Sequence, residues 1–285
     1  MKHYKASVNN KKKKKKKRSK NILLIIIILI LICTIIFSFT NIIIWAIDSK
    51  KSGEIKNEID EIATVDEVSD NENTKLVGQP EESEELNDYW YYVKFPLINV
   101  DFDELKTKNS DTIGWINVNN TNINYPIVQT DNNDYYLNHS FDKTWNDAGW
   151  VFLDYRNNSN FSDKNTIIYA HSRLDKTMFG SLSKALNPNW HKNKDNHIIR
   201  ISNEEENSLW QIFSVYVIET ESYYITTSFN DNTSYLDFLN TMKDRSKYNF
   251  NTTLTAEDRI ITLSTCYDDD RKTVVHAKLL KKETR

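Results

Sequence analysis

Residues 260–266 read Ile-Ile-Thr-Leu-Ser-Thr-Cys, and Tyr-Asp-Asp-Asp-Arg-Lys follows at 267–272. The β-branched residues favour a strand that ends at Cys266, and the acidic run indicates a polar turn before a new strand at Thr273. A thiol at a strand end sits on a fixed backbone and still faces solvent, as a nucleophile requires. A buried structural cysteine is the alternative, and the polar residues after Cys266 weaken it.

A second strand, Thr166-Ile-Ile-Tyr-Ala, is followed directly by His171. An imidazole within hydrogen-bond reach of a thiol can act first as general base and then as general acid. A structural histidine is the alternative. The other histidines fit this role less well, because they lie in the N-terminal tail, in loops, at a strand start or within a strand: His3, His139, His191, His197 and His276.

Two cations, Arg271 and Lys272, follow the turn after Cys266. Either could face the oxyanion of a thioester-forming intermediate, or both could be solvated charges of a hairpin. One cysteine and scattered histidines lack the spacing of a metal site, so we expect neither a metal nor an organic cofactor. Only 5 glycines are present and no glycine-rich phosphate loop occurs, which disfavours a nucleotide enzyme.

Short strands recur along the C-terminal part of the chain. We predict them at 115–118, 123–128, 150–153, 166–170, 197–201, 210–218, 259–263 and 273–279. Helices are predicted at 86–93, from 101 onward, and at 235–242, where apolar residues are spaced three and four apart. Many short strands with few helices indicate a mainly β fold, either a barrel or a sandwich decorated by helices.

The N-terminal region divides by composition. Residues 1–20 hold 11 Lys or Arg and no acidic residue, which predicts a disordered basic tail. Residues 21–47 are almost wholly apolar and long enough to cross a membrane as a helix. This apolar run argues against nuclear targeting or nucleic-acid binding by the basic tail. A cleaved signal peptide is an alternative, although no small-residue cleavage site follows.

The basic flank predicts a single-pass membrane protein with a cytoplasmic N-terminus and an extracellular C-terminal domain. Residues 48–85 are acidic, polar and free of aromatic residues, which predicts a flexible stalk. The catalytic domain is expected at 86–285. Cys33 lies in the apolar run, so it cannot pair with Cys266, which should be a free thiol.

Several stretches together resemble the sortases. Thr262-Leu-Ser-Thr-Cys266 resembles their T-L-x-T-C signature, and Tyr169-Ala-His171 with residues 177–182 resembles their histidine segment, particularly in class B. Four further stretches resemble class B in order and spacing: 111–116, 125–128, 133–139 and 152–156. The resemblance covers roughly residues 86–281. It implies an eight-stranded sortase β-barrel with N-terminal helices and a helix before the seventh strand, at 235–245.

The resemblance also implies roles for particular residues. Cys266 corresponds to the nucleophile, His171 to the acid/base, and an arginine should begin the strand after the cysteine. Here Lys272 occupies that position and Arg271 precedes it, in a shortened turn. We predict a β-bulge that returns Arg271 to the site, because only a guanidinium offers a bidentate fork. Without it, a one-residue shift would present Lys272 instead.

A groove for the sorting signal is implied by the same resemblance. The residues expected along it are Asn133, Leu137, Tyr169, Thr220, Tyr224, Ile225 and Ser264. Each could instead be an ordinary core or loop residue. The backbone N–H of Tyr267 is expected to stabilise the oxyanion together with Arg271.

The implied protein is a membrane-anchored cysteine transpeptidase. It would cleave a C-terminal sorting signal of the N-P-x-T-x type, form a thioester, and transfer the protein to a peptidoglycan or pilin amine. No nucleic acid is expected as a partner. Two alternatives remain: a cysteine peptidase that only hydrolyses, and a catalytically silent surface-binding domain on a stalk.

Overall fold

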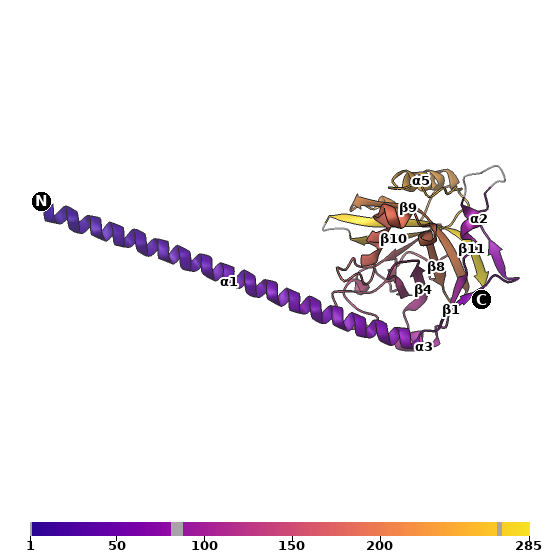
Figure 1. Cartoon of the computed structure of the whole chain (residues 1–285), viewed down its shortest axis with the longest axis horizontal. Helices are drawn as coiled ribbons and strands as arrows, with labels where there is room; N and C mark the ends of the chain where they lie inside the picture. The colour runs from indigo at the N-terminus through magenta and orange to yellow at the C-terminus, as the bar shows by residue number, and fades with distance from the viewer. Residues whose placement is uncertain (1, 81–87, 267–269) are drawn as a thin grey trace. The chain divides into compact units, whose positions relative to one another are not determined.

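The computed structural model describes residues 2–80, 88–266 and 270–285, with side chains from Lys20 onward except that of Cys266. Contacts divide the chain into two compact units, residues 1–50 and 51–285. Helix α1 (Lys2–Ile62) runs through the first unit and into the second (Figure 1).

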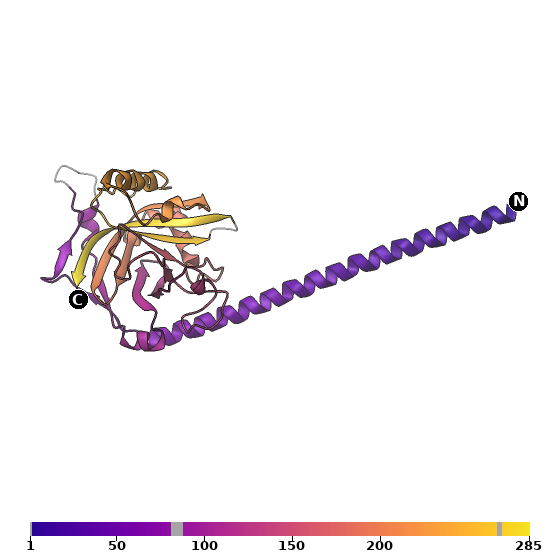
Figure 2. The same cartoon turned by 180° about the vertical axis from the view of Figure 1, so that it is seen from behind.

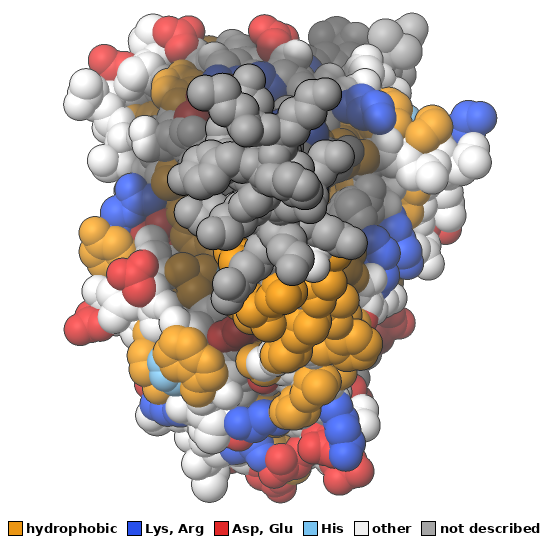
Figure 3. Space-filling model, turned by 90° about the vertical axis from the view of Figure 1, so that its left-hand side faces the viewer, with side chains coloured by type: hydrophobic (Ala, Val, Ile, Leu, Met, Phe, Trp, Pro, Cys, Tyr) orange, Lys and Arg blue, Asp and Glu red, His pale blue; other side chains and the backbone are white. Residues whose placement is uncertain are grey.

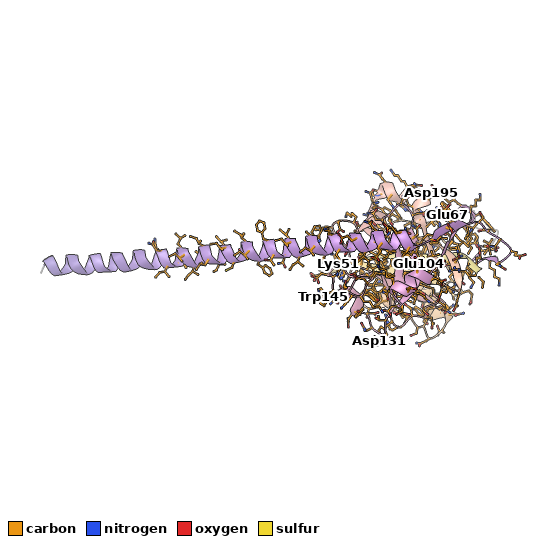
Figure 4. The ribbon with its side chains drawn as sticks, turned by 90° about the horizontal axis from the view of Figure 1, so that it is seen from below. Lys51, Glu67, Glu104, Asp131, Trp145 and Asp195 are labelled. Carbon is orange, nitrogen blue, oxygen red and sulfur yellow. The ribbon has the colours of Figure 1, made fainter. Side chains whose placement is uncertain are left out.

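The apolar part of α1 carries exposed hydrophobic side chains around the whole helix (Figure 4). Among the described residues, one helix is long and apolar enough to cross a membrane, and that helix is α1. A helix that is apolar on all sides matches a hydrocarbon environment. A signal sequence near an N-terminus has the same length and apolar character.

The second unit is built on eight strands of a barrel. They are β4 (Thr112–Val118), β5 (Asn124–Val128), β6 (Phe152–Leu153), β7 (Asn165–Tyr169), β8 (Ile198–Ser202), β9 (Glu206–Glu219), β10 (Ile260–Cys266) and β11 (Arg271–Thr284). The order of neighbours is β10-β7-β6-β5-β4-β8-β9-β11, and pairing of β10 with β11 closes the ring (Figure 1, Figure 2). This closed eight-stranded barrel confirms the predicted fold class.

Helix α5 (Asn232–Asp244) covers one side of the barrel (Figure 1). Alternate residues of a strand face opposite sides, so Val275 of β11 joins the main core while Val274 packs beneath α5. Asp231 begins the helix by accepting a hydrogen bond from the Ser234 backbone N–H at 2.7 Å. The helix predicted before the seventh strand is confirmed.

Shorter elements surround the barrel. They are α2 (Tyr89–Tyr92), β3 (Leu97–Val100), α3 (Asp103–Lys108), η1 (Tyr135–Leu137), η2 (Gly180–Leu186), α4 (Pro188–His191), η3 (Lys194–His197) and η4 (Tyr223–Ile225). On the face shown in Figure 3, the described basic and acidic side chains are interspersed. A continuous basic patch, which would favour nucleic acid, is not visible among them.

Residues 51–76 differ from the flexible stalk predicted for 48–85. Ile55 and Ile59, on the last turns of α1, are 5% and 0% exposed and belong to the main core. Strand β1 (Val65–Val68) pairs with β3, and β2 (Thr74–Leu76) extends the sheet beside β11. The composition gave no sign of this, because two isoleucines and backbone hydrogen bonds are enough to dock a polar segment.

Candidate active site

Two neighbouring strands end together at one rim of the barrel. β7 and β10 run parallel, and their paired residues extend from Asn165 and Ile260 to Tyr169 and Ser264. His171 and Cys266 each lie two residues beyond this last pair. The backbone therefore brings both predicted reacting residues to the same level of adjacent strands.

A cavity of about 280 Å³ opens at this rim. The described residues that line it come from the ends of β7, β10 and β11 and from the segments around η1 and η4. They are Asn133, Leu137, Phe152, Tyr169, Ala170, His171, Thr220, Glu221, Tyr224, Ile225, Ser264, Thr265 and Lys272. All seven residues expected along the groove are among them, and their contacts with a substrate stay a prediction.

The prediction omitted four other lining residues, Phe152, Ala170, Glu221 and Thr265. Ala170, Glu221 and Thr265 directly follow a predicted groove residue, and Phe152, Ala170 and Thr265 lie within the stretches that resemble the sortases. Tyr267, expected to supply a backbone N–H, lies outside the described residues. The expected groove residues that the structure describes therefore all line the cavity, and the role of Tyr267 stays a prediction.

The ring of His171 is held by the backbone of η1. Its Nε2 lies 2.7 Å from the carbonyl oxygen of Leu137. A carbonyl oxygen only accepts, so Nε2 carries a hydrogen and Nδ1 is the nitrogen that can exchange a proton in the neutral ring. The Phe179 backbone N–H donates to the His171 carbonyl at 3.0 Å, which fixes the start of the loop.

Gly149 packs closely against the same Leu137 carbonyl. Its φ of 58° favours glycine, and an added Cβ would lie 2.5 Å from the Tyr136 oxygen and 2.8 Å from the Leu137 oxygen. A side chain at this position would have to displace backbone rather than a flexible side chain. Gly149 thus lets the η1 backbone approach closely enough to meet His171.

The register of β10 and β11 bears on the choice between the two cations. Pairing continues without a shift from Ile260 and Lys278 to Cys266 and Lys272. Lys272 lies across from Cys266 and lines the cavity, whereas Arg271 is exposed and lines no part of the cavity that the structure describes.

The prediction of a β-bulge beside Arg271 is wrong, because the pairs described above continue without a register shift. Lys272 is paired on both sides, with Cys266 of β10 and Ile218 of β9, so no extra residue is accommodated there. Shifts in the β9–β11 ladder occur only further along β11, after His276 and after Leu279. The catalytic role of Arg271 itself stays a prediction.

A buried carboxylate, Asp154, lies behind the cavity-lining residues Asn133 and Tyr169 and is 0% exposed. Arg156 donates to it from Nε at 2.8 Å and from a terminal nitrogen at 2.7 Å. Asn133 Nδ2 donates at 3.1 Å and the Tyr169 hydroxyl at 3.0 Å. Burial alone would raise the pKa of Asp154, but the hydrogen bonds from Arg156 and Tyr169 outweigh it and lower the pKa.

Two histidines set aside in the sequence serve as buried structural groups. His276 lies 2.8 Å from both the Tyr216 and the Thr262 hydroxyl oxygens, and burial lowers its pKa to about 3. His197 lies 2.8 Å from the Tyr92 hydroxyl, and burial lowers its pKa to about 4. Among the side chains that the structure describes, no group of three or more His, Cys, Asp or Glu could hold a metal ion.

Comparison with known proteins gives consistent matches. Residues 116–280 match the family model described as the sortase domain. The chain is 40% identical over 188 residues to sortase B of Listeria monocytogenes, covering 63% of this chain and 74% of that protein.

Two solved structures are also similar to this chain. A Bacillus anthracis protein described as similar to sortase B is 37% identical, with a TM-score of 0.60, covering 74% of this chain and 90% of its own. A Staphylococcus aureus sortase B–substrate complex is 37% identical, with a TM-score of 0.59, covering 63% of this chain and 84% of its own.

Proposed function

This chain belongs to the sortase family, and from that premise we propose that Cys266 and His171 are the reacting pair of its cysteine transpeptidase activity. One observation carries the proposal. Both residues lie two positions beyond the paired Ser264 and Tyr169, at the rim of a cavity lined by every described residue expected along the groove.

The first step forms a thioester. The Cys266 thiolate attacks the carbonyl carbon of the threonine in the sorting signal, so a C–S bond forms and the oxygen becomes an oxyanion. The C–N bond then breaks, and protonated His171 gives its Nδ1 proton to the leaving amine. The threonine is left bound to the sulfur as a thioester.

The second step transfers the threonine to an acceptor. An amine attacks the thioester carbon, and its excess proton passes to neutral His171. The C–S bond breaks as the new amide forms. Thiolate and imidazolium are restored, so the cycle needs no oxidant, reductant or cofactor.

A cation next to the reacting carbonyl would stabilise the oxyanion. Lys272 is the better candidate, since it lines the cavity opposite Cys266 and Arg271 does not. An ammonium acts as a point charge and lacks the bidentate fork of a guanidinium. The Tyr267 backbone N–H is the proposed second donor.

The substrates proposed for this chain are secreted proteins with a C-terminal sorting signal of the N-P-x-T-x type. Support comes from the similar Staphylococcus aureus sortase B–substrate complex, and from another sortase B structure that is complexed with triglycine. A glycine-type amine of peptidoglycan is therefore the proposed acceptor, and a pilin lysine amine is the alternative. The apolar part of α1 would anchor the chain with its N-terminus in the cytoplasm and residues 51–285 outside.

A product analysis tests the proposal. The full chain in detergent is incubated with a pool of N-P-x-T-x peptides, with and without triglycine, and products are identified by mass spectrometry. We expect an amide to triglycine that requires Cys266 and is absent from Cys266→Ala. Hydrolysed peptide alone, even with triglycine, would indicate a peptidase, and no product at all would indicate a silent binding domain.

A further inference from the structure

We propose that Asp154 and Arg156 are a positioning pair. They hold together three chain segments that line the cavity, and they determine which groups on its polar side donate hydrogen bonds and which accept them. Neither residue lines the cavity that the structure describes. Both act through residues that do. The inference rests on the proposed function, because it describes how the groove is prepared for a sorting peptide.

Every position on the Asp154 carboxylate is occupied from within the protein. Oδ1 accepts the Arg156 backbone N–H at 3.0 Å and its Nε at 2.8 Å. Oδ2 accepts a terminal nitrogen of Arg156 at 2.7 Å, Asn133 Nδ2 at 3.1 Å and the Tyr169 hydroxyl at 3.0 Å. A fully buried carboxylate with five donors is a rigid centre, since no competing water reaches it.

The same centre reaches three separate chain segments that line the cavity. Asn133 belongs to the segment before η1, and its Oδ1 also accepts the Tyr155 backbone N–H at 3.0 Å. Tyr169 ends β7. The Arg156 terminal nitrogen that bonds Asp154 also donates to the Ile225 carbonyl of η4 at 3.0 Å. Two loop segments are thereby tied to one strand of the barrel.

The carboxylate also decides which groups at the wall can donate. Ionised Asp154 only accepts, so the Tyr169 hydroxyl gives its single hydrogen inward and can offer a ligand only an acceptor oxygen. Desolvation by burial raises the pKa of Tyr169 further, which keeps that hydrogen in place. Asn133 is oriented with Oδ1 toward Tyr155 N and Nδ2 toward Asp154, which leaves its second Nδ2 hydrogen as a donor.

The Tyr169 hydroxyl and the Asn133 amide both bond Oδ2 of Asp154, so an acceptor oxygen and an N–H donor lie close together. A ligand group that carries both N–H and C=O suits this arrangement. An amide of the sorting peptide has this chemistry. Replacing Asp154 by Asn would supply two hydrogens of its own, so the Tyr169 hydroxyl could turn and the Arg156 fork would lose its charge partner.

The test compares Asp154→Asn with a matched control. Asp163 accepts the Asn158 backbone N–H at 2.7 Å, Asn158 Nδ2 at 2.8 Å and Asn157 Nδ2 at 3.1 Å, but bonds no cavity residue through these contacts. Both substitutions are made in the full chain carrying Cys266→Ala. Binding of the N-P-x-T-x peptide pool is measured, together with hydrogen exchange of backbone amides at 132–138 and 222–226.

We expect Asp154→Asn to weaken peptide binding at least tenfold and to speed exchange in both segments at least tenfold, with neither change in Asp163→Asn. Tyr169→Phe alone should weaken binding, and adding Asp154→Asn should weaken it little further, because the two act through one hydrogen bond. Independent, additive effects would indicate mere destabilisation and overturn the proposal.

Unchanged exchange, or faster exchange without weaker binding, would also overturn it. If Asp154→Asn does not fold, Arg156→Lys keeps the charge but loses the fork, and should shift both measurements in the same direction by a smaller factor. Failure of the proposed function is seen separately. In that case the unsubstituted chain forms no amide product, while exchange still reports whether Asp154 holds the walls.

Discussion

Tyr169 and Ser264 are directly paired on parallel strands, and the chain continues for two residues beyond each of them, to His171 and Cys266. Parallel strands deliver the ends of both segments to the same edge of the sheet. The alignment of the two reacting residues is thus a property of strand register and does not depend on a long loop.

The choice between the two cations is testable by substitution. Lys272→Ala should lower kcat/KM for peptide cleavage by about 100-fold, as loss of an oxyanion donor does, whereas Arg271→Ala should lower it less than about threefold. Lys272→Arg should retain most of the activity. Steady-state kinetics on the N-P-x-T-x pool measure all three, and the opposite ranking would restore Arg271 as the functional cation.

Gly149→Ala should reduce kcat about tenfold or more, because its Cβ would push the Leu137 carbonyl away from His171 Nε2. Gly53→Ala is the control, since no atom lies within 4 Å of the added Cβ and the site is in α1. That change should stabilise the protein by about 0.5–1 kcal/mol without altering kcat. Equal kcat in Gly149→Ala and the parent chain would show that the close approach does not position His171.

Acid should destabilise the fold through its buried neutral histidines. The pKa values of His276 and His197 are lowered by burial to about 3 and about 4, against 6.5 ordinarily. The unfolded chain therefore binds protons below pH 6.5 that the folded chain does not, and stability falls as pH drops from 6.5 toward 4. The slope should be about 1.4 kcal/mol per pH unit for each histidine.

Urea unfolding between pH 7.5 and 4.5 measures this slope. His276→Gln cannot take up a proton, so its stability should start lower at pH 7.5 but decline less steeply. An unchanged slope in that variant would assign the acid sensitivity to other groups.

The docked end of α1 should contribute to the stability of the catalytic unit. Ile59→Ala removes a side chain that is 0% exposed in the main core, which should cost about 2–5 kcal/mol. Asn57→Ala, at an exposed position two residues earlier, should change stability by less than about 0.5 kcal/mol. Thermal unfolding of both variants decides the matter, and similar melting temperatures would mean that the segment does behave as a stalk.

The sequence predicted those features that local patterns carry. Runs of β-branched and aromatic residues located all eight barrel strands, and apolar spacing located α5. The groove residues followed from motif resemblance, and the structure gathers all seven of them around one cavity.

Features that depend on distant pairing were missed. β2 is polar and is stabilised by Lys281–Glu283, about 200 residues away in the chain, so nothing nearby indicates a strand. The unshifted pairing at Lys272, which excludes the predicted bulge, follows from the ladders on both sides of β11, and a single sequence does not specify these ladders. Asp154 gains its significance only because Asn133 and Tyr169 donate to it from distant segments, and because its partner Arg156 also donates to Ile225.

Closure of the ring between β10 and β11 has a mechanical consequence. β10 pairs with β7 on one side and with β11 on the other. It therefore cannot shift by one residue along β7 without breaking its ladder with β11 as well. The segments bearing Asn133 and Ile225 are held by side-chain hydrogen bonds instead of such a ladder. Backbone ladders therefore fix the strand ends that carry the reacting pair, whereas the width of the groove mouth depends on the Asp154–Arg156 pair.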